Sequence, residues 1–479
     1  MIIKNVEELT AHGNTSGRRI ALDILEAGLR AADPYDNVRK LVRVEGGRLI
    51  VGHEDVALPP SGKPLVFDLS RVGNIYVVGG GKAAQRQAKA LEDALGDLIA
   101  DGHVNAKKGD TVQLQRVGVT LAGHPIPDED SVAGARKILE IERKARAGDI
   151  VFHSESGGGS ALLTLPAPGL TLADLQAVNH ILYFECGASM WDTNAVRNML
   201  VVLRGRHARH SGEATLIQIS TDERPPRLRV PAPGRDYRQH VAADAYEYAI
   251  DILKHYRCWE RVPESVRQFL LAADPQYGPL RPDEWQGKPM YYFRVMGPEY
   301  MLEAAQRRAR EIGLTPAIVA SSLSDVEAKS AGEVLAYMAR EVEYYGRPIE
   351  PPCVLLCGGE LVVTVGDGKG SGGRNQEFVL AAAPRIAGSE KIVVASADSD
   401  GRDGPTDPAG GLVDGLTMGR VREAGFDLHA EVREHNSYPV LRAIGDAIYT
   451  GVQGTNVQDL RVVYVAGRSE LPPAEDVIG

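Results

Sequence analysis

Short apolar runs and longer stretches of helical spacing alternate along most of the chain. Residues 18–32 predict an amphipathic helix, because Leu22, Leu25 and Leu29 recur at intervals of three and four. Runs such as residues 75–78 are short enough for buried strands, and each ends in a glycine-rich or polar turn before the next helix. Strands that alternate with helices in this way predict βαβ units, a mainly parallel sheet and helices on both of its faces.

The same pattern divides the chain into an α/β series, a helical stretch and a second α/β series. The first series includes a predicted hairpin at residues 41–52, with Gly46 and Gly47 at its turn. Residues 244–273 carry helical spacing without a glycine-rich turn. We therefore predict an N-terminal domain over residues 1–243, a helical connecting region over 244–285 and a C-terminal domain over 286–479.

The composition is that of a globular chain with more than one hydrophobic core. Of 479 residues, 43% are hydrophobic and 25% are charged, and this length exceeds the roughly 100–200 residues of one domain. The formal net charge of −10 argues against general nucleic-acid binding, which needs a basic surface. No apolar run of about 18 residues occurs, so we expect no membrane partner. Four cysteines are too few for a disulfide framework, and we expect a cytoplasmic protein.

The first glycine-rich turn consists of Gly79, Gly80 and Gly81, followed by Lys82. A strand that passes through glycines into a helix presents several backbone N–H groups at the helix N-terminus, where an anion binds readily. Lys82 adds a positive charge at the same place. The spacing matches neither the Rossmann nor the Walker motif. The turn therefore predicts either a phosphate site or a plain tight turn.

The second glycine-rich turn consists of Ser156, Gly157, Gly158, Gly159 and Ser160. Three glycines let the main chain approach a ligand closely, and the two serines offer hydroxyl groups. The apolar residues that follow favour a helix start, which indicates a second anion site. The alternative is a flexible surface loop.

Two further turns occur in the second α/β series. One is a glycine-rich segment that ends at Arg374, a residue type suited to bidentate contact with phosphate or carboxylate. The other carries Asp398, Asp400, Asp403 and Asp407, which suit Mg²⁺ or substrate hydroxyl groups. Polar turns also use aspartates for local hydrogen bonds, so that interpretation stays open.

Together the four turns predict phosphoryl transfer. Two anion sites in one half of the chain, with an arginine and an acidic turn in the other, would surround ATP with Mg²⁺ and a small anionic acceptor. Phosphoryl transfer depends mainly on positioning and charge neutralisation, which lysine, arginine, backbone N–H groups and a metal provide.

Several motifs occur in a fixed order along most of the chain. They are GGGKAA, GHPIPDE, SGGGSALL, NAVRNML, GGELVVTV, GGRNQE, DGRDGPTDPAG and GTNVQDL. In these motifs the chain resembles the class II glycerate 2-kinases, a family with a C-terminal MOFRL domain. Some members of that family carry the older name hydroxypyruvate reductase.

The resemblance implies a fold and a reaction. It implies an α/β protein with a Rossmann-like parallel-sheet N-terminal domain, a second, smaller α/β domain with a mixed sheet, and a cleft between them. The implied reaction transfers the γ-phosphate of ATP to the 2-hydroxyl of D-glycerate with Mg²⁺. The implied partner is a small hydroxy acid, and a homodimer is left open.

The resemblance also implies roles for individual residues. Lys82 and Arg374 match the active-site lysine and arginine, and the two glycine-rich turns match the phosphate-binding and nucleotide-binding segments. The substrate-binding positions fall on Asn194, Arg197 and Glu360, with Arg197 facing the acceptor carboxylate. Asp400 and Asp403 fall at the positions that we expect to hold the metal.

The chain departs from the family pattern near the acceptor site. Asn198 stands where a basic residue is usual, and an arginine-rich segment with Arg224, Arg227 and Arg229 replaces a shorter acidic turn. Two alternatives therefore stay open beside the kinase. One is an NAD(P)H-dependent hydroxypyruvate reductase, although the expected dinucleotide fingerprint is missing. The other is a non-catalytic ligand-binding homologue.

Overall fold

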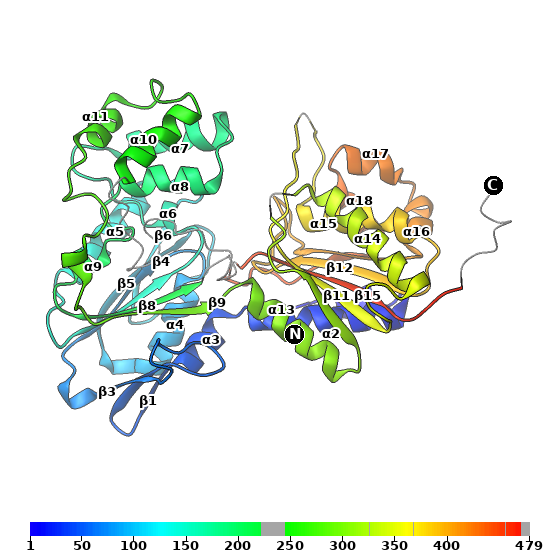
Figure 1. Cartoon of the computed structure of the whole chain (residues 1–479), viewed down its shortest axis with the longest axis horizontal. Helices are drawn as coiled ribbons and strands as arrows, with labels where there is room; N and C mark the ends of the chain where they lie inside the picture. The colour runs from blue at the N-terminus through cyan, green and yellow to red at the C-terminus, as the bar shows by residue number, and fades with distance from the viewer. Residues whose placement is uncertain (222–244, 325, 367, 456, 471–479) are drawn as a thin grey trace. The chain divides into compact units, whose positions relative to one another are not determined.

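The computed structural model describes residues 1–221, 245–324, 326–366, 368–455 and 457–470 (Figure 1). They form two compact units. The parallel-sheet unit comprises residues 34–221 and 245–296. The mixed-sheet unit comprises residues 1–33 together with the described residues from 297 onward. None of the described helices is long and apolar enough to cross a membrane.

The parallel-sheet unit is built on six parallel strands in the order β6-β5-β4-β7-β8-β9. The strands are β4 (Ile75–Gly80), β5 (Ile99–Lys107), β6 (Gly118–Ala122), β7 (Ile150–Glu155), β8 (Thr215–Thr221) and β9 (Met290–Met296). The chain runs outward from β4 in one direction and then outward from β7 in the other. This is the doubly wound Rossmann order, with its switch point between β4 and β7. The predicted Rossmann-like sheet is therefore confirmed.

Helices cover both faces of this sheet, as the alternating pattern predicts (Figure 1). The helices that pack on it include α3 (Pro34–Leu41), α4 (Ala84–Leu95), α5 (Glu129–Glu142), the short α6 (Gly159–Leu162) and α9 (His207–His210). From α5, Val132, Ala135 and Ile138 enter one core with Val78 and Val151 of the sheet. A separate antiparallel sheet of β1 (Val42–Glu45), β2 (Arg48–Val51) and β3 (Leu65–Asp68) contains the predicted hairpin.

A group of helices stands beyond the sheet in the same unit. It consists of α7 (Leu172–Asn179), the π-helical η3 (His180–Glu185), α8 (Met190–Met199), α10 (Ala245–His255) and α11 (Glu264–Ala272), whereas the short α12 (Pro282–Trp285) contacts α9. Residues from α7 and α8 share one core with residues from α10 and α11, for example Val178, Val196, Leu253 and Val266. The predicted connecting region is thus part of the first unit, because its apolar face packs on helices that precede it in the sequence.

The mixed-sheet unit has six strands in the order β10-β11-β15-β12-β13-β14. These are β10 (Thr315–Ala320), β11 (Cys353–Gly359), β12 (Ile392–Asp398), β13 (Gly410–Asp414), β14 (Ala447–Ile448) and β15 (Asp459–Val465). Only the β10–β11 pair is parallel among the described pairs, and the others are antiparallel. The predicted mixed sheet of the second α/β domain is therefore confirmed.

Two layers of helices enclose the mixed sheet. Helices α14 (Ala328–Tyr345) and α15 (Arg374–Ile386) lie on one face, and α2 (Thr15–Ala31) and α13 (Pro298–Glu311) lie on the other (Figure 1). The remaining short helices of the unit are α1 (Val6–Leu9), α16 (Thr417–Glu423), α17 (Leu428–Arg433) and α18 (Ser437–Ala443).

The predicted domain boundaries need two corrections. Residues 1–33, expected in the N-terminal domain, belong to the mixed-sheet unit, where α2 packs on α13, β12 and β15. Strand β9, expected in the C-terminal domain, is the last strand of the parallel sheet. The spacing of Leu22, Leu25 and Leu29 correctly predicts a helix with one buried face, but spacing alone does not specify which sheet that face covers.

Candidate functional site

The first two glycine-rich turns meet at the switch point of the parallel sheet. Strands β4 and β7 are neighbours, with Gly79 opposite Ser154 and Gly80 opposite Glu155. The two turns then contact each other through hydrogen bonds. The Lys82 N–H donates to Gly157 O at 2.9 Å, and the Ala83 N–H donates to Ser156 Oγ at 2.9 Å. Open α/β sheets bind their ligands at this position.

Glycine is required where these turns approach each other. Gly81 has φ +140°, and a Cβ atom there would lie 2.1 Å from Ser156 Oγ. Gly158 has φ +85° at the residue before α6, and a Cβ there would lie 3.0 Å from His124 and 3.4 Å from Lys82. A larger residue at either position would therefore separate the turns or strain the backbone.

Positive charge gathers beside these turns. Burial, together with Lys82, Lys107 and Arg197, lowers the pKa of His124 to about 3. His124 is therefore neutral at physiological pH. His124 lies in the GHPIPDE motif, but no local pattern marks it as a site residue. Only its three-dimensional proximity to Gly158 and Lys82 identifies it.

Asn194 and Arg197 come together on α8. Arg197 Nε donates to Asn194 Oδ1 at 2.9 Å, and one terminal nitrogen donates to Asn179 Oδ1 at 3.3 Å. All three side chains are buried. Two amide oxygens thus fix the orientation of the guanidinium, whose planar donor pattern suits a carboxylate. The predicted pair is therefore brought together, and Asn179 is an additional residue of the group.

A buried polar network supports the end of β7. Glu155 accepts a hydrogen bond from Gln218 Nε2 at 2.6 Å and forms an ion pair with Arg204. Arg204 lies beneath Gly159, where a Cβ would meet its guanidinium at 2.5 Å. Arg204 is therefore a buried support of the second turn. Arg224, Arg227 and Arg229, the other arginines noted in the sequence, lie outside the described residues.

The second cluster lies in the mixed-sheet unit around Arg374, the first residue of α15. Its guanidinium forms ion pairs with Asp459 at 2.9 Å, Asp398 at 2.6 Å and Glu360 at 3.0 Å. Strand pairing explains the convergence, because Asp459 at the start of β15 lies opposite Gly359 on one side and Asp398 on the other. The predicted residues Arg374 and Glu360 are therefore brought together, with two further aspartates.

The charges in this cluster shift one another. Burial alone would lower the pKa of Arg374, but Asp459, Asp398 and Glu360 outweigh it and raise that pKa well above its usual value. Burial and the neighbouring Asp400 raise the pKa of Asp398. Asp459 is also buried, yet Arg374 and Arg461 lower its pKa. The cluster thus holds several carboxylates around a permanently charged guanidinium.

The two aspartates predicted as metal ligands differ in their surroundings. Asp400 is half-buried and its carboxylate accepts a hydrogen bond from the Arg402 N–H at 2.9 Å. Asp403 is fully buried, and its two oxygens accept from the backbone N–H groups of Asn375 at 3.1 Å and Gln376 at 2.9 Å. Burial raises the pKa of Asp403 to about 6.

Asp403 therefore caps the N-terminus of α15, and its role as a metal ligand stays a prediction. The carboxylates of Glu360, Asp398 and Asp400 are hard oxygen donors of the kind that Mg²⁺ prefers, so the residues present fit that ion. Asp398 belongs to the acidic turn noted in the sequence, whereas Asp459 was not selected there. Their positions at strand ends carried some signal, but only the strand register brings them together.

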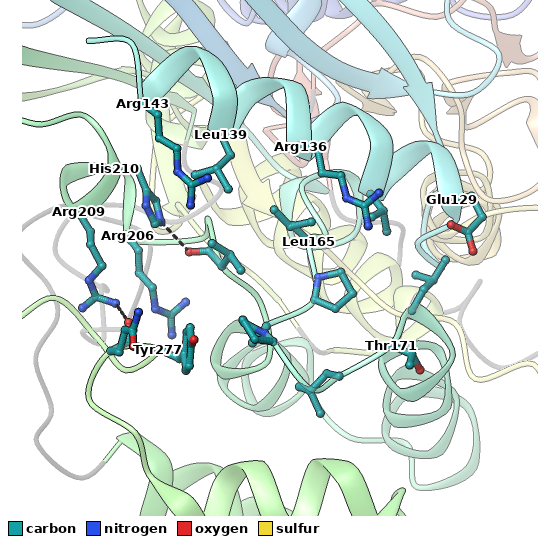
Figure 2. A pocket seen from close by; sticks show the side chains of 18 residues that line it. Glu129, Arg136, Leu139, Arg143, Leu165, Thr171, Arg206, Arg209, His210 and Tyr277 are labelled. Carbon is teal, nitrogen blue, oxygen red and sulfur yellow. Dashed lines mark hydrogen bonds between the residues drawn. The ribbon is translucent and has the colours of Figure 1, made fainter. Parts of the chain in front are cut away.

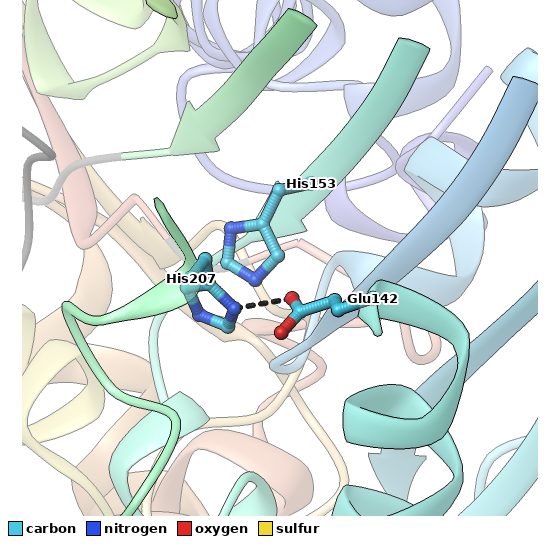
Figure 3. Close-up of side chains that lie close together, drawn as sticks. All are labelled: Glu142, His153 and His207. Carbon is cyan, nitrogen blue, oxygen red and sulfur yellow. Dashed lines mark hydrogen bonds and ion pairs between the residues drawn. The ribbon is translucent and has the colours of Figure 1, made fainter. Parts of the chain in front are cut away.

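A third polar cluster is buried within the parallel-sheet unit (Figure 3). Glu142, His153 and His207 place one ligand-type atom each within 4.8 Å of the others. His207 Nδ1 lies 2.5 Å from Glu142 Oε1, and the two imidazole rings pack with their centroids 3.6 Å apart. Burial raises the pKa of Glu142 to about 8 and lowers that of His207 to about 3.

The geometry of this cluster favours a structural role. A metal ion requires ring nitrogens that approach it from separate directions, whereas these rings pack against each other. The direct Glu142–His207 hydrogen bond occupies the carboxylate oxygen nearest the ring. We therefore interpret the cluster as a neutral, hydrogen-bonded part of the core.

Comparison with known proteins identifies the same two halves of the chain. A family model described as a domain of unknown function (DUF4147) matches residues 20–271, and a model of the MOFRL family matches residues 353–459. Among curated proteins, a glycerate 2-kinase of Pyrococcus horikoshii is 38% identical over 94% of this chain and 99% of its own length. A putative hydroxypyruvate reductase of Agrobacterium vitis is 34% identical over 82% of this chain and 87% of its own length.

A solved structure supports the same relationship. The crystal structure of a glycerate kinase from Thermotoga maritima aligns with a TM-score of 0.76 at 29% identity, and covers 94% of this chain and 99% of its own. The likeness therefore extends over both units and not only over the glycine-rich turns. The chain belongs to the glycerate 2-kinase family, and it combines a DUF4147 region with a MOFRL region.

Proposed function

We propose that this protein is an ATP-dependent kinase that phosphorylates the 2-hydroxyl of D-glycerate or of a closely related small hydroxy acid, with Mg²⁺, in the cytoplasm. The observation that carries the proposal is the meeting of the two glycine-rich turns at the switch point of the parallel sheet, beside Lys82. Family membership supports the same reaction, since relatives over nearly the full length are named glycerate 2-kinases.

The glycine-rich turns would hold the phosphates of ATP. Their backbone N–H groups can approach phosphate oxygens closely because no Cβ intervenes at Gly81 or Gly158. Lys82 would place a positive charge against the transferred phosphoryl group. Because the nearby His124 is neutral, it adds no competing charge and can donate or accept one hydrogen bond.

The acceptor would bind at Arg197. Its guanidinium is held by Asn194 and Asn179 in a fixed orientation, which suits the carboxylate of a 2-hydroxy acid. Fixing that carboxylate orients the neighbouring hydroxyl toward the phosphoryl group and lowers the entropic cost of transfer. Asn198 stands in the same helix and is buried, so a basic contact is replaced there by an amide.

Arg374 and its carboxylates would supply the remaining charge. Glu360, Asp398 and Asp400 are the residues that would hold Mg²⁺, which neutralises phosphate charge when it is bound. Arg374 would balance the carboxylates in the absence of the metal and contact phosphate oxygens in its presence.

The test is an ADP-release assay with D-glycerate and a series of other 2-hydroxy acids, with NADH oxidation followed in parallel. We expect Mg²⁺-dependent ADP release with D-glycerate or a close relative and no NADH oxidation. NADH oxidation with hydroxypyruvate, without ADP release, would instead identify a reductase. The absence of both activities with intact nucleotide binding would identify a non-catalytic homologue.

A further inference from the structure

A cavity whose lining includes no residue of the glycine-rich turns opens in the parallel-sheet unit (Figure 2). It has a volume of about 570 Å³, within the range of pockets that bind small molecules. Its walls are one face of α5, the segment Leu165–Leu172 and the region around Arg206–His210 with Tyr277. None of Gly79–Lys82, Ser156–Ser160 or Arg197 lines it.

Two arginines of α5 supply exposed positive charge to this cavity. Arg136 and Arg143 are two helical turns apart on the same face, and both side chains extend from α5 over the cavity (Figure 2). Neither side chain forms an ion pair or hydrogen bond with any residue that the structure describes. Both guanidinium groups are therefore available for a ligand.

A third arginine of the lining carries a buried charge without a carboxylate. Arg206 is 4% exposed, and its guanidinium donates to the carbonyl oxygens of Gly278 at 2.8 Å, Asn198 at 2.8 Å and Val201 at 3.0 Å. No described acid lies within ion-pair distance of it. Burial and the nearby Arg209 lower its pKa to about 10, so the surroundings disfavour a positive charge that no anion balances.

The remaining charges do not cancel this excess. Arg209 forms an ion pair with Glu284 at 2.6 Å and is balanced. His210 contacts a backbone oxygen at 3.4 Å, and burial lowers its pKa. Glu129 is the one acidic residue of the lining, and it lies at the opposite end of α5 from Arg143. The end of the cavity around Arg143 and Arg206 is therefore strongly positive.

The rest of the wall is apolar. Leu139, Leu165, Pro166 and Pro168 line the space between the arginines, and Tyr277 adds an aromatic side chain. An inorganic anion would leave these surfaces in contact with water. A ligand with an apolar or aromatic body and a terminal anionic group would cover them and pair with the arginines.

We propose that this cavity is a second ligand site that binds a small organic phosphate, with its phosphate group at Arg136 and Arg143 and its apolar body against Leu165, Pro166 and Tyr277. The class of ligand follows from the combination of unpaired arginines with an apolar wall. The site differs from the proposed ATP site in its residues and in the elements that carry them.

The test is calorimetric titration of the full-length protein with phenyl phosphate, in parallel with inorganic phosphate. The titrations use the Lys82→Ala background, which weakens phosphate binding at the glycine-rich turns. We expect saturable binding of phenyl phosphate that weakens with added salt, and binding of inorganic phosphate that is weaker by about tenfold.

The double variant Arg136→Ala/Arg143→Ala should weaken phenyl phosphate binding by about tenfold or more. The matched control is Lys137→Ala/Arg146→Ala, which removes the same charge from exposed residues that do not line the cavity. The control should bind within about twofold of the parent. Equal loss in both double variants, no binding by the parent at millimolar phenyl phosphate, or equally tight binding of inorganic phosphate would each overturn the proposal.

Discussion

The two clusters of predicted site residues use different parts of the polypeptide. In the parallel-sheet unit, backbone groups define the site, since glycine turns contact each other through N–H groups and carbonyl oxygens and cationic side chains surround them. In the mixed-sheet unit, side chains define it, since Arg374 lies among Glu360, Asp398 and Asp459. A backbone site depends on the absence of side-chain atoms, whereas a side-chain site depends on charge balance. The two should therefore fail in different ways when they are mutated.

The largest effect is expected at the charges nearest the transferred phosphate. Lys82→Ala should lower kcat/KM for phosphorylation by about 10³-fold, because a positive charge on the developing phosphoryl transition state is lost. Lys89→Ala is the control, since Lys89 lies on the following helix and pairs with Asp93 at the surface. Steady-state ADP-release kinetics measure both. Near-normal activity in Lys82→Ala would remove Lys82 from the proposed mechanism.

The backbone character of the first cluster is tested by adding one methyl group. Gly81→Ala should destabilise the protein by about 2 kcal/mol and reduce activity, because its Cβ would lie 2.1 Å from Ser156 Oγ. Gly96→Ala is a matched control, since Gly96 also has a positive φ, +52°, but has no atom within 4 Å of the added methyl. Urea denaturation compares the two, and equal losses would show that backbone strain alone is responsible.

The side-chain character of the second cluster is tested by separating its aspartates. Asp403→Ala should lower the free energy of unfolding by about 1–2 kcal/mol, because two backbone N–H groups of α15 lose their acceptor. Asp400→Asn should instead raise the Mg²⁺ concentration needed for half-maximal activity and leave stability within about 0.5 kcal/mol. The reverse pattern would identify Asp403, rather than Asp400, as the metal ligand.

The smallest effect concerns the buried cluster around Glu142. Because burial raises its pKa from 4.5 to about 8, the folded state keeps a proton that the unfolded state releases, and stability falls as pH rises through this range. Buried histidines such as His153 and His207 act in the opposite direction near pH 6.5, because burial lowers their folded pKa while their unfolded forms are still partly protonated. We therefore compare the parent with Glu142→Gln, which keeps the histidines, and expect the difference between their free energies of unfolding to change by about 1–2 kcal/mol between pH 6.5 and 8, to the disadvantage of the parent at pH 8. Denaturation at both pH values measures it, and parallel curves would contradict the assignment.

The sequence predicts local features of the fold and of the site well. The helical stripe of α2, the hairpin at Gly46 and Gly47, and the two glycine-rich turns are each specified by residues close together in the chain. Glycine turns are also recognisable because few residues other than glycine tolerate their geometry. For this reason the two turns that meet at the switch point were both selected from the sequence, whereas His124, Asn179 and Arg204 were identified only from the structure.

Features that depend on long-range pairing were not predictable. Asp459 enters the site because β15 pairs with both β11 and β12 in a particular register, and no local pattern fixes that register. Asp403 and Asp400 look alike in the sequence, and only burial against the start of α15 distinguishes the carboxylate that caps this helix from the half-buried one. The same limit explains the misassigned residues 1–33.

The placement of residues 1–33 has a consequence for how the protein is made. The parallel-sheet unit is inserted into the sequence of the mixed-sheet unit, so α2 is synthesised long before β12 and β15, the strands that it covers. The apolar face of this helix, formed by Leu22, Leu25 and Leu29, has no packing partner while the inserted unit is synthesised. The nascent chain therefore carries the uncovered apolar face of α2 until β12 and β15 have been synthesised. A C-terminal fragment expressed without that helix should be insoluble unless the missing segment is supplied in trans.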